Sequence, residues 1–267
     1  MSLRALPTLL KVGFAEAAAY RTEMVVWVLS TTMPLVMMLL WTSIADVAPV
    51  EGQGGASWSS GSFVGYFLCV FIVRQLVAAW AAWEINFEVR QGTLAMRLLK
   101  PLHPLIAFAT SNLAYLPLRA LVTLPVAVFL FVAHRDALSG DWRLWLLFPL
   151  SIFGAWLITF FVNVAVGALS FSVDSSLRVM DLWFALFFVF SGYLVPLDFF
   201  PPWLREVSAW LPFRYVLSLP VELMTGRVPF DAALGLVARQ ALFALGLGAL
   251  SLTMWTRGVS RFQAFGG

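Results

Sequence analysis

The amino-acid sequence predicts an all-α integral membrane protein with six transmembrane helices. Of its 267 residues, 61% are hydrophobic and only 12% are charged, whereas soluble domains usually carry about 25% charged residues. Six apolar stretches approach or exceed the roughly 18 to 20 residues that a helix needs to cross a bilayer. These stretches are continuous rather than alternating, which favours helices over the strands of a membrane barrel. The composition therefore excludes a soluble enzyme and a nucleic-acid-binding domain.

The N-terminal residues predict a helix in the membrane interface rather than a cleaved signal peptide. Apolar residues recur at helical spacing within 1–22, with polar residues on the other side. A simple extension of the first span is the alternative. The six spans are expected at about 24–44, 62–83, 105–133, 144–171, 182–197 and 232–255. Pro117 and Pro125 interrupt the third span, and residues 1–267 are expected to form a single transmembrane domain.

The distribution of basic residues predicts the orientation of the bundle. With the N-terminus in the cytoplasm, nine Lys and Arg residues fall in cytoplasmic segments and five in external segments. Cytoplasmic loops of membrane proteins carry an excess of Lys and Arg, so both termini are expected in the cytoplasm. The charged segment 84–104, between the second and third spans, then lies on the cytoplasmic side.

Catalytic and metal-binding residues are not predicted in this chain. Its one cysteine, Cys69, lies within an apolar run, which excludes an intrachain disulfide and a zinc site. His103 and His134 fall in loops on opposite faces of the expected membrane, so neither can activate a buried serine. The phosphate-binding motif G-x-x-x-x-G-K-[S/T] is absent, so the chain is not expected to hydrolyse ATP. The Gly/Ser-rich run 52–62 predicts a flexible loop.

The cytoplasmic segment 84–104 contains the clearest local pattern. Gly92 is expected to end the preceding helix, and Thr93 is well placed to cap a new one. Residues 94–100 give about two helical turns, and Pro101 prevents their continuation. A short helix held outside the membrane suits docking into a groove on a cytoplasmic partner. A solvated connector is the alternative interpretation.

This pattern resembles a known family. Glu88-x-Arg90-x-Gly92-Thr93-Leu94, followed by Leu98-Leu99-x-Pro101, is similar to the cytoplasmic coupling segment of ABC-2 type permeases, the membrane subunits of bacterial ATP-binding-cassette exporters. The sequence departs from the family at Gln91, where the loop often carries an acidic residue. The resemblance implies an ATPase-coupling site formed by Glu88, Arg90, Gln91, Gly92, Thr93, Leu94, Arg97, Leu98 and Leu99.

A second resemblance lies in region 198–231 and the residues just before it. It is carried by Ser191-Gly192-Tyr193, Pro196-Leu197, Phe200-Pro201-x-Trp203-Leu204, Leu211-Pro212-Phe213, Pro220 and Gly226. In the same family these residues belong to two short extracellular re-entrant helices before the last span. The two motifs occur in the expected order and on the expected sides of the membrane.

The resemblance implies a permease subunit of an ABC exporter in the bacterial inner membrane. It would move an amphipathic or lipid-like compound, such as a drug, lipid or peptide, outward. ATP and Mg would bind to a separate cytoplasmic ABC ATPase, and this chain would bind no cofactor. The other expected partners are membrane lipid and a second permease, either a second copy or a paralogue, but no nucleic acid. The alternatives are an ATP-independent secondary carrier and a membrane scaffold.

Two arginines near the middle of expected spans, Arg74 and Arg119, are candidates for a substrate path, because ionisable residues at membrane depth are often functional. Pairing with an acid such as Glu222 or Asp181 is the alternative, and a structural role is favoured for Arg119. All fourteen Asp and Glu residues fall in loops or near span ends, which argues against a proton-coupled carrier. Other candidate path residues are Asn163, Phe187 and Phe188.

Overall fold

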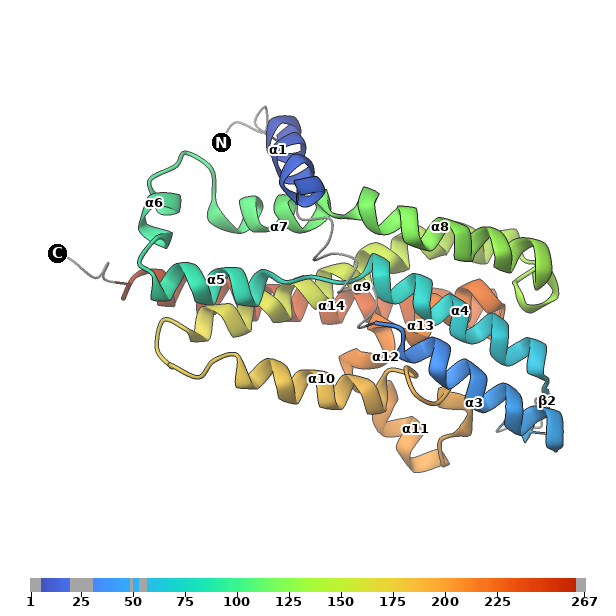
Figure 1. Ribbon diagram of the computed structural model, residues 1–267. Coiled ribbons are helices and arrows are strands. Elements are labelled where there is room, and N and C mark those ends of the chain that lie inside the picture. Colours follow the sequence, from blue (N-terminus) through green and yellow to red (C-terminus); the bar gives the residue numbers. More distant parts are fainter. Residues whose placement is uncertain (1–5, 20–30, 49, 53–56, 263–267) are drawn as a thin grey trace.

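The computed structural model describes residues 6–19, 31–48, 50–52 and 57–262 as an elongated helical bundle with one small β-hairpin (Figure 1). Four apolar segments in this part are long enough to cross a membrane: Ser60–Arg90, Pro104–Ala133, Trp142–Leu169 and Phe230–Val259. They correspond to the second, third, fourth and sixth spans that the sequence predicts. The all-α class is therefore confirmed for the described residues.

Two helices are described before residue 50. Helix α1, Leu6–Ala19, packs along α7, and its Leu10 and Phe14 side chains are exposed. The remainder of the predicted interfacial helix lies outside the described residues. Helix α3, Met33–Val47, packs against α4. It is the described part of the first predicted span, whose residues 24–30 also lie outside the description.

The loop before the second span is more ordered than its Gly/Ser content predicts. Strand β1, Val50–Glu51, pairs antiparallel with β2, Ser57–Trp58. Trp58 is buried, and its ring packs against Phe63 and Phe199. This burial of a large aromatic side chain fixes the hairpin to the bundle, so the prediction of a flexible loop is wrong for these residues.

The second and third spans are each divided into two helices. The second consists of α4, Ser60–Leu76, and α5, Ala81–Arg90; the third consists of α7, Pro104–Ala114, and α8, Leu116–Ala133. Pro117 lies in the first turn of α8, directly after the break at Tyr115, and so marks the predicted interruption, whereas Pro125 lies inside α8 without ending it. The break at 77–80 contradicts the continuous helix predicted there.

Two long helices support the rest of the bundle. Helix α9, Trp142–Leu169, follows the short 3-10 helix η2, Arg135–Ala137, and packs against α14, Phe230–Val259. Small residues allow this close approach: a Cβ atom added to Gly248 would lie 3.0 Å from the Phe161 ring. Gly248 and the buried Ala244 are thus used for packing within the chain.

The fifth predicted span, 182–197, is shorter in the structure. Helix α10, Arg178–Phe190, has 13 residues, which corresponds to a length of about 20 Å. It ends before Gly192, whose φ of 83° belongs to the left-handed region, and the Tyr66 hydroxyl donates to the Gly192 carbonyl at 2.8 Å. The chain then turns through the 3-10 helix η3, Leu197–Phe199.

Three short helices precede the last span, where the sequence predicts two. They are α11, Pro202–Ala209; α12, Pro212–Val216; and α13, Ser218–Thr225. The break between α12 and α13 has a local cause in Pro220. Proline has no N–H group to donate to the carbonyl of Val216 four residues earlier, and its ring would collide with that carbonyl in a continuous helix.

Candidate functional sites

The predicted turn and short helix lie at the end of the bundle where the described chain terminates (Figure 1). Gly92 has a φ of 72°, in the left-handed region that favours glycine, and it follows α5 directly after Gln91. Helix α6, Leu94–Leu98, has five residues rather than the predicted two turns. Thr93 lies at the N-cap position, but its hydroxyl donates to the Glu88 carbonyl at 3.5 Å instead of capping α6.

Glu88 and Arg97 form an ion pair that joins α5 to α6. Arg97 Nε donates to Glu88 Oε2 at 2.9 Å, and Arg97 Nη2 donates to Glu88 Oε1. The Arg97 guanidinium also lies 4.3 Å from the centre of the Phe108 ring. With 16% of Glu88 and 29% of Arg97 exposed, this bidentate pair holds α6 in place within its own chain.

The leucines of this segment divide into buried and exposed positions. Leu94 is fully buried in a cluster with Ile85 and Phe108, and Leu98 packs at the edge of that cluster. Leu94 therefore anchors α6 and is not available to fill a groove on another protein. Leu99 is 81% exposed, and Met96, which the sequence motif did not single out, is 68% exposed.

The two polar residues between the helices face outward. Arg90 pairs with Asp174 in the connection between α9 and α10, through Nη1 to Oδ1 at 3.3 Å. Gln91 is exposed and ends α5. The end of α5 is therefore tied to its neighbours at the surface, where a partner can reach it.

The break between α4 and α5 is held by side chains from the third span. Arg119 is buried, and its Nη1 donates to the Ala78 carbonyl at 2.8 Å and to the Gln75 carbonyl at 3.4 Å. The backbone N–H of Trp80 donates to Asn112 Oδ1 at 2.7 Å. Because backbone groups freed by a broken helix need partners, these two side chains stabilise an interruption in a sequence that contains neither glycine nor proline there.

Arg74, one turn before this break, has a different environment. Its Nε is buried and has no hydrogen-bond partner among the described residues, and its guanidinium lies 5.4 Å from the centre of the Phe187 ring. Arg74 and Arg119 lie near the middle of Ser60–Arg90 and Pro104–Ala133, respectively. The described residues form five ion pairs, and neither arginine belongs to any of them.

The structure brings most of the predicted path residues together. Phe187 is buried beneath Arg74, and Phe188 contacts Phe187 while 38% of it remains exposed. Asn163 is separate in role: its Oδ1 accepts from the Ala82 N–H at 3.2 Å, and its Nδ2 donates to the Thr159 carbonyl at 2.9 Å. Asn163 therefore stabilises the start of α5.

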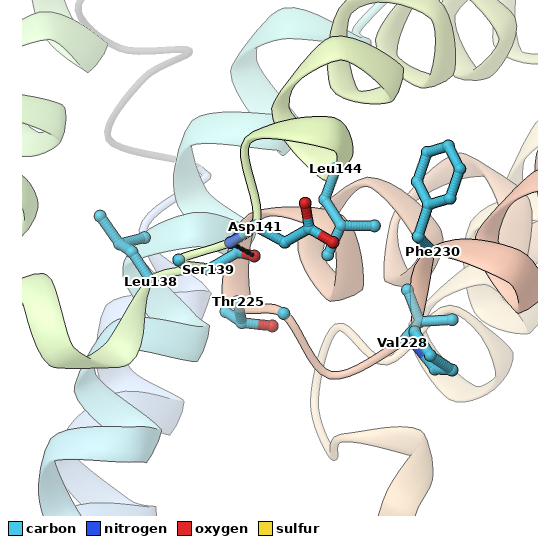
Figure 2. Close-up of a pocket in the computed structure, with 10 residues that line it drawn as sticks. Leu138, Ser139, Asp141, Leu144, Thr225, Val228 and Phe230 are labelled. Atoms are coloured by element: carbon cyan, nitrogen blue, oxygen red, sulfur yellow. Dashed lines mark hydrogen bonds between the residues drawn. The ribbon is translucent and has the colours of Figure 1, made fainter.

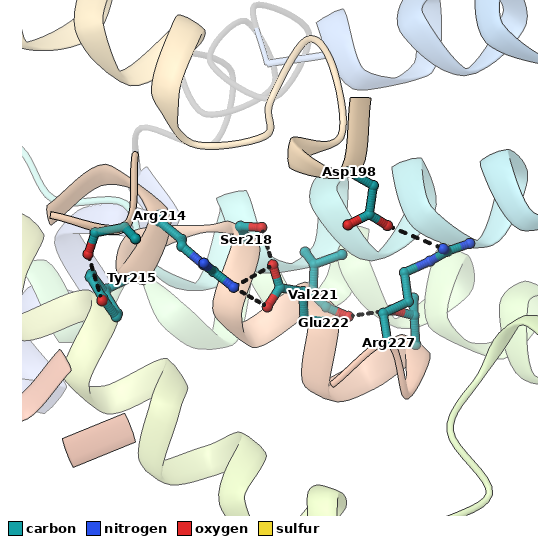
Figure 3. Close-up of polar contacts among 9 residues, drawn as sticks. Asp198, Arg214, Tyr215, Ser218, Val221, Glu222 and Arg227 are labelled. Atoms are coloured by element: carbon teal, nitrogen blue, oxygen red, sulfur yellow. Dashed lines mark hydrogen bonds and ion pairs between the residues drawn. The ribbon is translucent and has the colours of Figure 1, made fainter. Parts of the chain in front are cut away.

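The acids proposed as partners for Arg74 have other contacts or positions. Glu222 accepts from Arg214 Nη2 at 3.1 Å and from Ser218 Oγ at 2.8 Å (Figure 3). The carboxylate of Glu222 raises the pKa of Arg214, so this cation stays charged. Asp181 is exposed in the first turn of α10. Pairing of Arg74 with either acid is thus not observed.

A second ion pair lies in the same region before the last span. Asp198 Oδ2 accepts from Arg227 Nη1 at 3.4 Å (Figure 3), and the Arg227 guanidinium lies 3.3 Å from the centre of the Trp58 ring. Burial raises the pKa of Asp198 and lowers that of Arg227. These contacts connect the β-hairpin, η3 and the end of α13 into one structural cap.

A pocket of about 350 Å³ opens between the connections that precede α9 and α14 (Figure 2). Its polar groups are already used in structural contacts. The Ser139 N–H donates to the Met224 carbonyl at 2.7 Å, and Asp141 caps α9 through the Arg143 N–H at 2.9 Å. The neighbouring Arg143 side chain lowers the pKa of Asp141. We therefore regard this pocket as a junction between connections.

Asn112 and Trp80 were not among the residues that the sequence pointed to. The available signal was weak: Asn112 is a single amide within an apolar helix, and such residues usually serve helix packing. Its Nδ2 also donates to the Phe108 carbonyl at 2.9 Å. Only the contact between Asn112 and Trp80 identifies its role at the break.

Comparison with protein families adds one finding. Residues 29–266 match a family described as ABC-2 family transporter protein. The matched range contains α6, the break between α4 and α5, and all four candidate spans. A search of curated proteins gives no match to the chain.

Proposed function

This chain belongs to the ABC-2 family of transporter proteins, and we propose that it is the permease subunit of an exporter. A separate cytoplasmic ATPase binds ATP and Mg and supplies the energy, while this chain provides the path for an amphipathic or lipid-like compound. The arrangement of α6 between two divided spans supports this function best. On one side α6 leads through α5 to the break at 77–80, and on the other through α7 to the break at Tyr115.

In this proposal α5, α6 and α7 move together as a lever. The Glu88–Arg97 pair joins α5 to α6, and the Trp80–Asn112 hydrogen bond joins the far ends of α5 and α7. A force applied to α6 is therefore transmitted both to the break at 77–80 and to the break at Tyr115. Non-helical backbone at membrane depth is a common feature of transporters and lies where helices move or ligands bind. The lever would move against α4 and α8 and open a path outward.

The surface that receives the ATPase differs from the sequence hypothesis in its apolar contacts. Met96 and Leu99 are exposed on and after α6, and Phe87 is 62% exposed on the last turns of α5. These three side chains, together with Arg90 and Gln91, are the proposed docking surface. Gly92 and Thr93 shape the turn, and Leu94, Leu98, Glu88 and Arg97 hold the segment rigid.

The proposed membrane arrangement has six spans in the bacterial inner membrane, with both termini in the cytoplasm. The four candidate spans are joined by the segment that ends in α3 and by the segment that contains α10. The lever end and the end of α14 lie on the cytoplasmic side, and α11, α12 and α13 lie outside. A second permease, which is a second copy or a paralogue, completes the path.

The first experiment identifies the partner. The full-length protein is purified from gently solubilised native membranes, and every co-purifying chain is identified. A soluble ATPase in stoichiometric amounts is expected, and a second multi-span chain beside it would identify a heterodimer. Reproducible recovery of the protein alone, under conditions that preserve other transporter complexes, would contradict the proposal and favour an ATP-independent carrier.

Gly92→Val tests the lever in that complex. A left-handed conformation costs a residue with a Cβ atom about 1–2 kcal/mol, so valine reshapes the turn that carries α6. ATP hydrolysis is expected to continue, while ATP-driven uptake of a fluorescent amphiphile into inside-out vesicles is lost. Gly235→Val is the matched control, because a Cβ atom at Gly235 has no neighbour within 4 Å. Unchanged uptake by the Gly92 variant would contradict the lever mechanism.

A further inference from the structure

Arg74 and Arg119 place two cations beside one another in the interior of the bundle. Arg119 Nη1 donates to the carbonyl of Gln75, the residue that follows Arg74, at 3.4 Å. Within the described part of the chain, neither arginine has an acidic ion-pair partner. Charged groups in a membrane interior are rare unless an opposite charge or a ligand compensates them.

The two arginines differ in how far their own chain satisfies them. Arg119 donates to two backbone carbonyls and is 5% exposed, so its charge is already stabilised by the break. The buried Nε of Arg74 has no partner in the part of the chain that the structure describes, and the aromatic face of Phe187 is the main described contact of Arg74. A guanidinium offers five N–H donors in a planar fork that matches carboxylates and phosphates. Arg74 therefore has N–H groups that can donate to a ligand, and Arg119 adds a second positive charge on the neighbouring span.

The surroundings of Arg74 also fit an apolar chain attached to the anion. Phe187 continues into Phe188, and both rings contact Tyr193. Beyond them, the outer side of α10 is apolar and exposed at Leu182 and Val189, which are 60% and 48% exposed. A molecule with its charged group at Arg74 could therefore extend its hydrocarbon portion over α10.

We propose that Arg74 binds the anionic group of an amphiphilic molecule beside the α4–α5 break. The inference deepens the proposed transport function, because it assigns the transported compound to a chemical class: amphiphiles whose phosphate or carboxylate group gives them a net negative charge. Arg119 is a positioning residue, since it holds the break and contributes charge. The anion would complete the hydrogen bonds of Arg74 at the level where α5 and α7 pivot, so that movement of the lever changes the site.

The test measures binding without ATP. The full-length protein, with the subunits that it retains, is purified in a neutral maltoside detergent, and bound probe is counted by native mass spectrometry. The probes are dodecyl phosphate, dodecylphosphocholine and inorganic phosphate. Dodecyl phosphate should bind, and the Arg74→Gln variant should bind it at least about tenfold more weakly, as expected for losing a hydrogen-bonded charge. Arg74→Lys should recover part of the binding, because lysine keeps the charge but not the fork.

Arg239→Gln provides the matched control. Arg239 also lies within a candidate span, but it is exposed on α14, so this variant removes the same charge without touching the site. It should bind like the wild type. The unfolding temperature of each variant without probe shows whether it is folded, and the lysine variant keeps the test informative if Arg74→Gln does not fold.

The outcomes separate the possible sources of the anion. Binding of dodecyl phosphate without binding of inorganic phosphate supports an amphiphilic ligand from the membrane. Equal binding of inorganic phosphate would indicate a ligand from the aqueous phase and would contradict the assignment to amphiphiles. Equal binding of dodecyl phosphate to wild type and Arg74→Gln, or equal binding of the zwitterionic probe, overturns the anion site. Gly92→Val should bind normally although it does not transport, so failure of the lever and failure of the site are distinguishable.

Discussion

Two arginines of this protein, Arg97 at the lever end and Arg74 in the interior, illustrate opposite uses of the same side chain. Arg97 donates twice to Glu88 and lies over the ring of Phe108. Arg74 contacts the ring of Phe187, and its Nε has no hydrogen-bond partner among the described residues. The better satisfied cation lies at the end of the bundle, and the less satisfied one lies near the middle of a candidate membrane span. This is the reverse of what stability alone would favour, because burying an unpaired charge is costly.

The difference indicates which region is built for rigidity and which for a ligand. A bidentate ion pair over an aromatic ring fixes α6 so that force applied to it is transmitted rather than absorbed. A cation with unused hydrogen-bond donors contributes little to stability, but it can bind an anion reversibly. In the comparison of these regions, Arg119 belongs with Arg97, since its contacts are made within the chain.

The largest expected effect on stability comes from replacing the two interior arginines in parallel. Arg119→Met leaves the carbonyls of Gln75 and Ala78 without their donor, and leaving buried polar groups unsatisfied costs about 1–3 kcal/mol each. Arg74→Met removes no hydrogen bond in the described structure, so it should cost less than Arg119→Met. The lost cation–π contact is worth about 0.5–2 kcal/mol, and removing an incompletely paired charge offsets part of this loss. Thermal unfolding in detergent measures both.

Equal destabilisation by the two variants would break the comparison. It would mean that Arg74 is a structural residue like Arg119, and its unsatisfied Nε would need another explanation than a ligand. An increase in the unfolding temperature of Arg74→Met would strengthen the comparison, because it would measure how much the unpaired cation destabilises the folded protein.

The sequence predicted the lever end better than the interior. Gly92 and Pro101 are local signals, and the turn and helix that they predict are present, although α6 is shorter. The break at 77–80 has no such signal, because its cause lies in Arg119 and Asn112 from another span. The division of the leucines into buried and exposed positions could not be predicted from the sequence either. A helix of five residues is too short for its apolar pattern to show which of its sides Phe108 and its neighbours cover.

A smaller effect is expected at the leucines of the lever, and it separates folding from coupling. Leu94→Ala removes a fully buried side chain, which typically costs about 2–5 kcal/mol. Leu99→Ala removes an exposed one and should change stability by less than about 0.5 kcal/mol. Only the second variant should weaken association with the ATPase while the protein keeps its unfolding temperature.

The measurement is co-purification of the ATPase together with thermal unfolding of each variant. If Leu99→Ala retains the full amount of ATPase, the exposed side chains do not form the docking surface. If Leu94→Ala is as stable as the wild type, α6 is not anchored by its burial, and the view of the lever end as the rigid region is incorrect.

The smallest expected change in stability is at Arg90, and it tests whether the lever end is also a contact surface. The Arg90–Asp174 pair is open to solvent, with 39% and 100% of the two side chains exposed, so removing it should cost less than about 1 kcal/mol. Arg90→Gln and Asp174→Asn both break this pair, but only the first removes the cation that the ATPase would contact. Reduced ATPase association in Arg90→Gln alone therefore identifies Arg90 as a docking residue. Equal reduction in both variants would instead assign the effect to the ion pair, and Arg90 would then belong with Arg97 among the residues that keep the lever rigid.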